Sequence, residues 1–191
     1  ALIDPKQKNC PYPFKMLCGA GIAFKFVQVL YKKMGIDVRE TLKFIEYAAI
    51  GTICDVVDLV GENRVIAKQG IHALNNTKNI GIRALLKENS LEPGSITAYH
   101  VGFILGPCIN AAGRLTKIDL ALERLDSAET ALKLLMAENV EDAAFLAEKL
   151  RELNSIRQDM TTKSLEEIVQ MVENSELKHD RVLVVYNGDV H

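Results

Sequence analysis

The chain has 191 residues, and its 48% hydrophobic and 25% charged content is ordinary for a globular protein. A formal net charge of −2 at pH 7 excludes the broadly cationic surface of non-specific duplex binders, so any nucleic-acid contact must come from a local pocket. No apolar run approaches the roughly 20 residues of a membrane span, and the four scattered cysteines lack the spacing of a zinc site, which favours reduced thiols.

The first half of the sequence predicts short helices separated by turns. Residues 1–14 hold three of the five prolines and are expected to be irregular. Gly35 and Gly51 are expected to end the first two helices. Apolar residues at three- and four-residue steps predict helices over residues 16–34, 39–50, 64–75 and 82–89.

A turn and an apolar run follow these helices. Ser95 or Thr97 is expected to cap a short helix. The apolar run after it has strand character and ends at Gly106 and Pro107, two residues that interrupt regular structure. The next residues, 110–114, have little side-chain bulk apart from one arginine.

Beyond residue 115, Ala, Leu, Glu, Lys and Gln dominate the composition and predict helices over 117–125 and 128–136. Asn139 is then expected to cap a helix that reaches residue 173, about 50 Å long at ~1.5 Å per residue. A helix of this length with one apolar stripe is usually a coiled coil or a strut between domains. Residues 182–186 predict a buried strand. We expect both ends of the chain, which starts at Ala1 without a basic leader, to be cuts through a larger protein.

The segment from Asn110 to Arg114 suits a single phosphate group. Small residues at an Ala-Ala-Gly turn would offer backbone N–H donors, Asn110 an amide, and Arg114 a bidentate guanidinium. Spacing alone favours a tight turn with Arg114 in a surface ion pair, because short glycine-containing motifs match by chance. Asp55, among apolar neighbours, is expected to be buried and paired by a cap, by backbone N–H groups or by a metal.

Three ordered motifs resemble those of a known family. Residues 106–115 (GPCINAAGRL) resemble the signature G-P-x-[IL]-N-A-[AS]-G-R-L of RecJ-type single-strand-specific exonucleases, members of the DHH phosphoesterase superfamily. Residues 51–57 (GTICDVV) are similar to the family's G-T-[VI]-x-D-V-V segment, and residues 9–25 resemble the segment that follows its DHH triplet. The resemblance covers nearly the whole chain.

The resemblance implies an α/β fold class: the C-terminal half of a DHH-type domain, largely helical here, then a long connecting helix and the first strand of a DHHA1-type domain. The corresponding domain boundaries are 1–116, 117–176 and 177–191. It further implies a bacterial cytoplasmic, monomeric enzyme of DNA repair and recombination that digests single-stranded DNA from its 5′ end. Its partners would be that DNA and a single-strand-binding protein or a helicase.

The resemblance also assigns roles to individual residues. Asp55 matches an aspartate that ligates Mn²⁺ or Mg²⁺, and Arg114 matches the arginine that holds the 5′ phosphate, with Asn110 and Gly113 beside it. His191 matches a histidine at the start of the DHHA1 domain and is a possible substrate contact. A two-metal site needs more carboxylates than this chain offers, because the family's other ligands lie before the position of Ala1. The chain alone is therefore expected to be inactive.

Several positions stay open at this point. Many family members carry Arg where this chain has Cys108, which would leave one positive charge fewer in the pocket. His72 and His179 are expected at the surface, His100 in the core, and the charged face of the long helix, including Arg157, in solvent. Two other functions compete: a DHH phosphodiesterase acting on oligonucleotides or cyclic dinucleotides, and a non-catalytic helical module built on the apolar stripe over residues 143–172.

Overall fold

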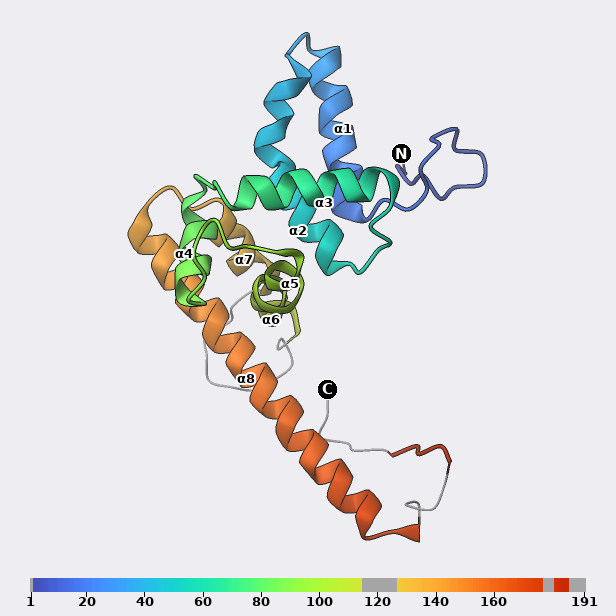
Figure 1. Cartoon of the computed structure of the whole chain (residues 1–191), viewed down its shortest axis with the longest axis vertical. Coiled ribbons are helices and arrows are strands. Elements are labelled where there is room, and N and C mark those ends of the chain that lie inside the picture. Colours follow the sequence, from blue (N-terminus) through green and yellow to red (C-terminus); the bar gives the residue numbers. More distant parts are fainter. Residues whose placement is uncertain (1, 115–126, 177–180, 186–191) are drawn as a thin grey trace.

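The computed structural model describes residues 2–114, 127–176 and 181–185, and within these ranges it contains helices and no strand. Figure 1 shows the shorter helices gathered at the N-terminal end of α8, whose C-terminal half extends away from them. None of the described helices is long and apolar enough to cross a membrane. The elements are α1 (Gly19–Lys33), the 3-10 helix η1 (Val38–Phe44), α2 (Ile45–Cys54), α3 (Gly61–Leu74), α4 (Ile80–Glu88), α5 (Ala98–His100), the π-helix η2 (Val101–Leu105), α6 (Gly106–Arg114), α7 (Ser127–Leu135) and α8 (Val140–Glu173).

The helices bury two apolar clusters. The smaller cluster lies where α1, α2 and α3 meet, and Phe24, Ala49 and Ile66 are among its members. The larger cluster joins α4, α6, α7 and the N-terminal half of α8. Its members include Leu86 and Leu150, whose side chains are almost completely buried. The predicted helices that lie within the described residues are present, the one over residues 39–50 beginning as the 3-10 helix η1, and α8 is part of the core for half of its length.

The second predicted helix does not end at Gly51. It continues as α2 to Cys54, with Asp55 as its C-cap residue. Gly51 lies against Ala20 of α1, where an added Cβ would collide with the alanine side chain. The glycine therefore serves close packing of α1 on α2 rather than helix termination.

The apolar run before Gly106 is helical, so its predicted strand character is wrong. Thr97 caps α5 as expected, and its N–H donates to Nδ1 of His100 (3.1 Å). The chain then passes through the π-helix η2 directly into α6. Wide π-turns inside longer helices are frequent at functional sites. His100, expected in the core, instead lies half-buried at this cap.

α8 confirms the predicted long helix as one continuous element. Asn139 is its N-cap, and Asn139 Oδ1 accepts a hydrogen bond from the N–H of Asp142 (2.8 Å). The apolar stripe divides into two parts: Ala143 and Leu150 are buried in the larger cluster, whereas Leu165 is 60% exposed. The second half of α8 therefore leaves the body, as a strut would (Figure 1).

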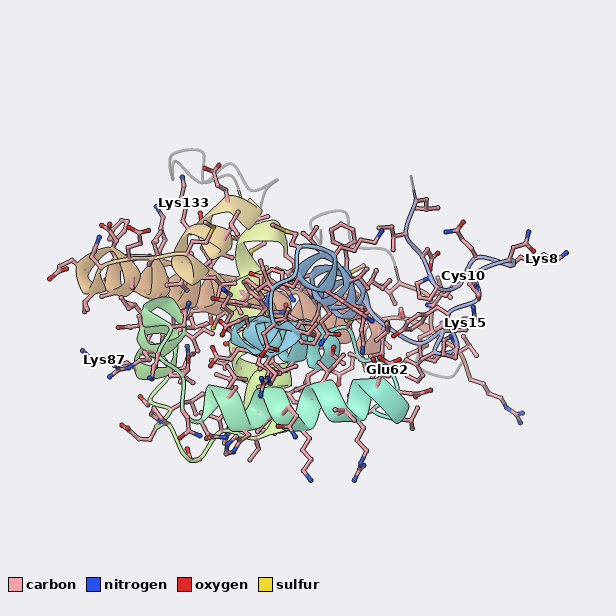
Figure 2. The ribbon with its side chains drawn as sticks, turned by 90° about the horizontal axis from the view of Figure 1, so that it is seen from above. Lys8, Cys10, Lys15, Glu62, Lys87 and Lys133 are labelled. Carbon is pink, nitrogen blue, oxygen red and sulfur yellow. The ribbon has the colours of Figure 1, made fainter. Side chains whose placement is uncertain are left out.

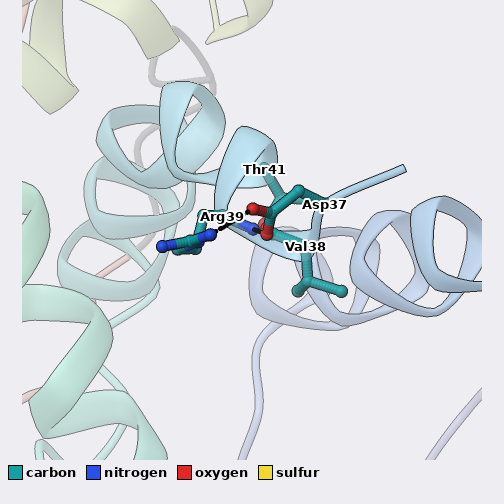
Figure 3. A network of polar contacts seen from close by, with 4 residues as sticks. All are labelled: Asp37, Val38, Arg39 and Thr41. Atoms are coloured by element: carbon teal, nitrogen blue, oxygen red, sulfur yellow. Dashed lines mark hydrogen bonds and ion pairs between the residues drawn. The ribbon is translucent and has the colours of Figure 1, made fainter. Parts of the chain in front are cut away.

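Local polar contacts fix two further segments. Asp37 caps η1 by accepting from the N–H of Arg39 (2.9 Å), and Arg39 Nε donates to the same carboxylate (2.8 Å), while Thr41 Oγ1 donates to the carbonyl of Val38 (2.6 Å). Figure 3 shows this network at the start of η1.

The N-terminal segment is held by contacts to its own backbone and to α3. Lys15 Nζ donates to the carbonyl of Cys10 (2.6 Å), and the Tyr12 hydroxyl donates to Oε1 of Glu62 (2.8 Å). Lys25 forms an ion pair with the same Glu62. Figure 2 shows Cys10, Lys15 and Glu62 on the same side of the molecule.

Two predictions remain untested. The helix expected over residues 117–125 lies outside the described residues, as does Tyr186 of the predicted C-terminal strand. Residues 181–185 carry no strand, so the strand that would open a DHHA1-type domain is not confirmed.

Candidate functional site

A small pocket of about 110 Å³ lies where α2, the η2–α6 helix and α8 meet. Cys54 at the end of α2 forms one wall, and Arg157 of α8 forms another. The remaining lining comes from η2 and α6: Gly102, Gly106, Pro107, Asn110 and Arg114. The pocket therefore contains both polar side chains of the sequence motif.

The four-residue spacing of the motif explains this arrangement. Residues four apart lie on one face of a helix, so Gly102, Gly106, Asn110 and Arg114 follow each other along the wall of the pocket. A Cβ on Gly106 would collide with Sγ of Cys54. The two glycines keep α2 close to α6 and leave the space into which the polar side chains project.

The pocket lining is cationic. Among the described residues, it carries two guanidinium groups, of Arg114 and Arg157, one amide, of Asn110, and no carboxylate. Neither arginine forms an ion pair with any other described residue. Within the part of the chain that the structure describes, the alternative of an Arg114 surface ion pair is therefore not observed.

The predicted turn of free N–H donors is wrong. Ala111, Ala112 and Gly113 lie inside α6, which continues η2 without a break. Their N–H groups therefore belong to a helix that starts well before them, where such groups donate to carbonyls of the preceding turn. Gly113 is exposed with open space around it, so its contribution is steric access next to Arg114.

Asp55 is exposed, which corrects the expectation of a buried carboxylate. It caps the C-terminus of α2, and the next residue, Val56, has φ +55°. Asp55 therefore stands at a sharp turn, directly after Cys54 of the pocket wall. No group of three or more His, Cys, Asp or Glu side chains suited to a metal occurs among the described residues. Asp55 by itself does not fit a divalent-cation site, which needs about six oxygen ligands.

Cys108 does not line the pocket, contrary to the expectation from the motif. Its side chain is fully buried in the larger cluster, and Sγ donates to Oδ1 of Asn89 of α4 at 3.5 Å. Burial raises the pKa of the Cys108 thiol, and this effect outweighs the opposing influence of Asn89 and of the nearby arginines. The thiol is therefore neutral at pH 7.

Neither of the two described histidines, His72 and His100, lines the pocket. His72 is exposed on α3 as expected, and His179 and His191 lie outside the described residues. The residue that sequence reasoning missed is Arg157, which was assigned to a solvated helix face. Its spacing of three from Asn154 was the available signal, because side chains three apart on a helix are neighbours.

Comparisons with known proteins agree with this architecture. No family model matches the chain. "Single-stranded-DNA-specific exonuclease RecJ" of Bacillus subtilis is 36% identical over 188 residues, which cover 98% of this chain and 22% of the relative. The protein of the same name from Escherichia coli is 29% identical over 204 residues, covering 100% of this chain and 34% of the relative. The chain thus spans about a fifth to a third of the length of these relatives.

Solved structures give the same result. The crystal structure of RecJ from Thermus thermophilus in complex with Mn²⁺ is 29% identical with a TM-score of 0.71, covering 87% of this chain and 23% of that chain. The corresponding Mg²⁺ complex is 31% identical with a TM-score of 0.69, covering 82% and 23%. The helical fold, the glycine-lined pocket and these matches together place this chain in the RecJ family of exonucleases.

Proposed function

We propose that this chain forms the 5′-end-binding part of a RecJ-type exonuclease that degrades single-stranded DNA in the 5′→3′ direction. The observation that carries the proposal is the pocket that Asn110 and Arg114 line, to which no carboxylate of residues 2–114, 127–176 or 181–185 contributes. Guanidinium groups bind phosphate oxygens through two parallel, charge-assisted hydrogen bonds. A volume of about 110 Å³ is well below that of ordinary small-molecule pockets and suits one small anion.

A pocket of this kind discriminates a strand end from the interior of a strand. A terminal phosphate carries one more ionisable oxygen than an internal phosphodiester, so a bidentate arginine gains more from it. Asn110 can donate a further hydrogen bond from its amide. Fixing the terminal phosphate places the first phosphodiester at a constant distance from the pocket, which gives digestion its polarity.

Asp55 is the residue of this chain that we propose as a metal ligand. The structural relatives are complexes with Mn²⁺ and Mg²⁺, and such ions supply charge neutralisation and an activated water in phosphodiester hydrolysis. We propose that Asp55, exposed beside the pocket wall, gives one carboxylate to a site whose other ligands lie outside this chain. The domain assignment that accompanies this proposal is a DHH part over residues 1–116, a connector over 117–176 and a DHHA1 part from 177.

The test compares matched oligonucleotides with a 5′ phosphate and a 5′ hydroxyl, digested by a full-length RecJ-type polypeptide that contains this segment. Because a charge-assisted hydrogen bond contributes about 1.5–3 kcal/mol, Arg114→Ala should slow use of the phosphorylated strand by roughly 10- to 200-fold. The hydroxyl strand should lose less. Arg114→Lys should restore only part of the loss, since an ammonium cannot form two parallel bonds. An equal loss on both strands would show that Arg114 does not read the terminal phosphate.

A further inference from the structure

We infer that Arg157 of α8 is the second cation of this phosphate pocket, and that Asn154 is the residue that positions it. This inference rests on the proposed function and adds a specificity-determining residue from the helix that leaves the body of the protein. Arg157 and Arg114 reach the pocket from different helices, α8 and α6. A ligand between them would therefore be gripped from two sides.

The Asn154 side chain fixes the orientation of the Arg157 guanidinium. Asn154 Oδ1 accepts hydrogen bonds from Nε (3.3 Å) and from Nη2 (3.1 Å) of Arg157. A guanidinium has five N–H donors in a planar fork, so one edge is held by the amide while donors remain for a ligand. Because Asn is neutral, this contact orients the arginine without neutralising its charge.

Asn154 is itself held in place. Only 8% of its surface is exposed, in a helix whose other side is solvated. Burial raises the pKa of the Cys108 thiol, and Arg151, Arg157 and Asn154 act on it in the opposite direction, so these side chains lie near that buried group. Asn154 thus lies on the packed side of α8, and its Oδ1 holds the guanidinium that reaches the pocket.

The charges favour an anion over any other ligand. Two guanidinium groups line one small space, and none of its described lining residues is a carboxylate. Like charges in one site repel each other, and an anion between them removes that cost. A terminal phosphate, with up to two negative charges, matches two arginines better than a phosphodiester with one. The preference for a phosphorylated end should therefore depend on both arginines.

The experiment measures fluorescence-anisotropy binding of a short single-stranded oligonucleotide, with a 5′ phosphate or a 5′ hydroxyl, to the 191-residue chain. Arg157→Ala should weaken binding of the phosphorylated strand by about tenfold or more and that of the hydroxyl strand by much less. Arg151→Ala is the matched control, since it removes the same charge from the same helix outside the pocket lining. Its effect should stay below about threefold because Arg151 is exposed and solvent and salt screen its charge.

Two further variants separate orientation from folding. Asn154→Asp would pair with Arg157 and compensate its charge, so it should reduce the phosphate preference while the melting temperature is kept. Arg157→Lys retains charge and most of the stem and should recover only part of the preference. If Arg157→Ala and Arg157→Lys both behave like Arg151→Ala while Arg114→Ala abolishes the preference, the inference is wrong and the proposed function stands. If Arg114→Ala also leaves the preference unchanged, the proposed function fails as well.

Discussion

Arg114, at the end of α6, and Arg157, within α8, line the same small pocket, whose described lining includes no carboxylate. The pocket therefore brings motif residues 106–114 next to α8, the helix whose second half extends away from the other helices. Movement of α8 relative to α6 would change the distance between the two charges. The pocket is therefore built from both parts of the chain, and each part can be altered separately.

The backbone strain at Val56 predicts a stabilising glycine substitution. Val56 has φ +55° although its side chain is 88% exposed, so little packing compensates the left-handed conformation. Val56→Gly should raise the free energy of unfolding by about 0.5–1 kcal/mol, because glycine adopts this conformation without steric cost. Val65→Gly, at a 60% exposed position inside α3, should lower it by about 0.5 kcal/mol. Urea denaturation measures both, and a loss of stability in the first variant would contradict the strain.

A buried asparagine holds the loop between α2 and α3. Asn63 Nδ2 donates to the carbonyls of Met16 (2.7 Å) and Asp58 (3.0 Å), while Oδ1 has no partner among the described residues. Asn63→Ala should cost about 1–3 kcal/mol, since two partly buried hydrogen bonds to backbone carbonyls are lost.

The control for this substitution is Asn76→Ala. Asn76 is exposed and donates to the carbonyl of His72 (2.9 Å), so its removal should change the stability by no more than about 0.5 kcal/mol. Thermal unfolding of both variants measures the stability that each substitution removes. Equal effects would show that burial of Asn63 does not stabilise the loop.

The Tyr12 hydroxyl predicts a loss of stability at high pH. Burial and the contact with Glu62 raise the pKa of Tyr12 from 10.0 to about 12. The folded state therefore holds this proton more tightly than the unfolded state. The resulting stabilisation is complete below pH 10 and disappears as the pH rises from 10 towards 12.

Absorbance titration of the wild type minus that of Tyr12→Phe isolates this tyrosine from the other four. The difference curve should have its midpoint about two pH units above that of an ordinary tyrosine. A midpoint near 10 would show that Tyr12 does not donate to a charged Glu62.

Asp55, an exposed carboxylate directly after Cys54 of the pocket wall, predicts weak metal binding by this chain. One carboxylate falls far short of the oxygen shell that Mn²⁺ or Mg²⁺ requires. Calorimetric titration with Mn²⁺ should give a dissociation constant weaker than about 0.1 mM, a range typical of poorly liganded sites. Sub-micromolar binding that Asp55→Ala abolishes would mean that this chain completes the site itself.

Local chemistry accounts for the parts of the fold that the sequence predicted. Asn139 and Thr97 act within three residues of their own position, so their caps were recognisable. Gly51 was misleading because its role is contact with α1, which depends on tertiary packing. The run before Gly106 misleads sequence-based prediction because a short apolar stretch fits both a strand and a buried helix.

The sequence predicts the part of the candidate site that α6 contributes, but not the part that α8 contributes. The four-residue spacing of Gly106, Asn110 and Arg114 follows from the sequence once the segment is known to be helical. The approach of Arg157 does not, because it depends on where α8 packs. The exposure of Asp55 and the burial of Cys108 likewise follow from how α2 ends and how α6 is rotated against α4 and α8.

The central claim, that this pocket binds a terminal phosphate, is tested most directly by NMR of the arginine side chains. The 191-residue chain would be titrated with a 5′-phosphorylated and with a 5′-hydroxyl oligonucleotide while the Nε–Hε signals are observed. We expect the signals of Arg114 and Arg157 to shift with the phosphorylated strand and to shift far less with the hydroxyl strand. The signals of Arg39 and Arg151 should stay in place with both strands. Unchanged Arg114 and Arg157 signals at saturating phosphorylated strand would contradict this claim.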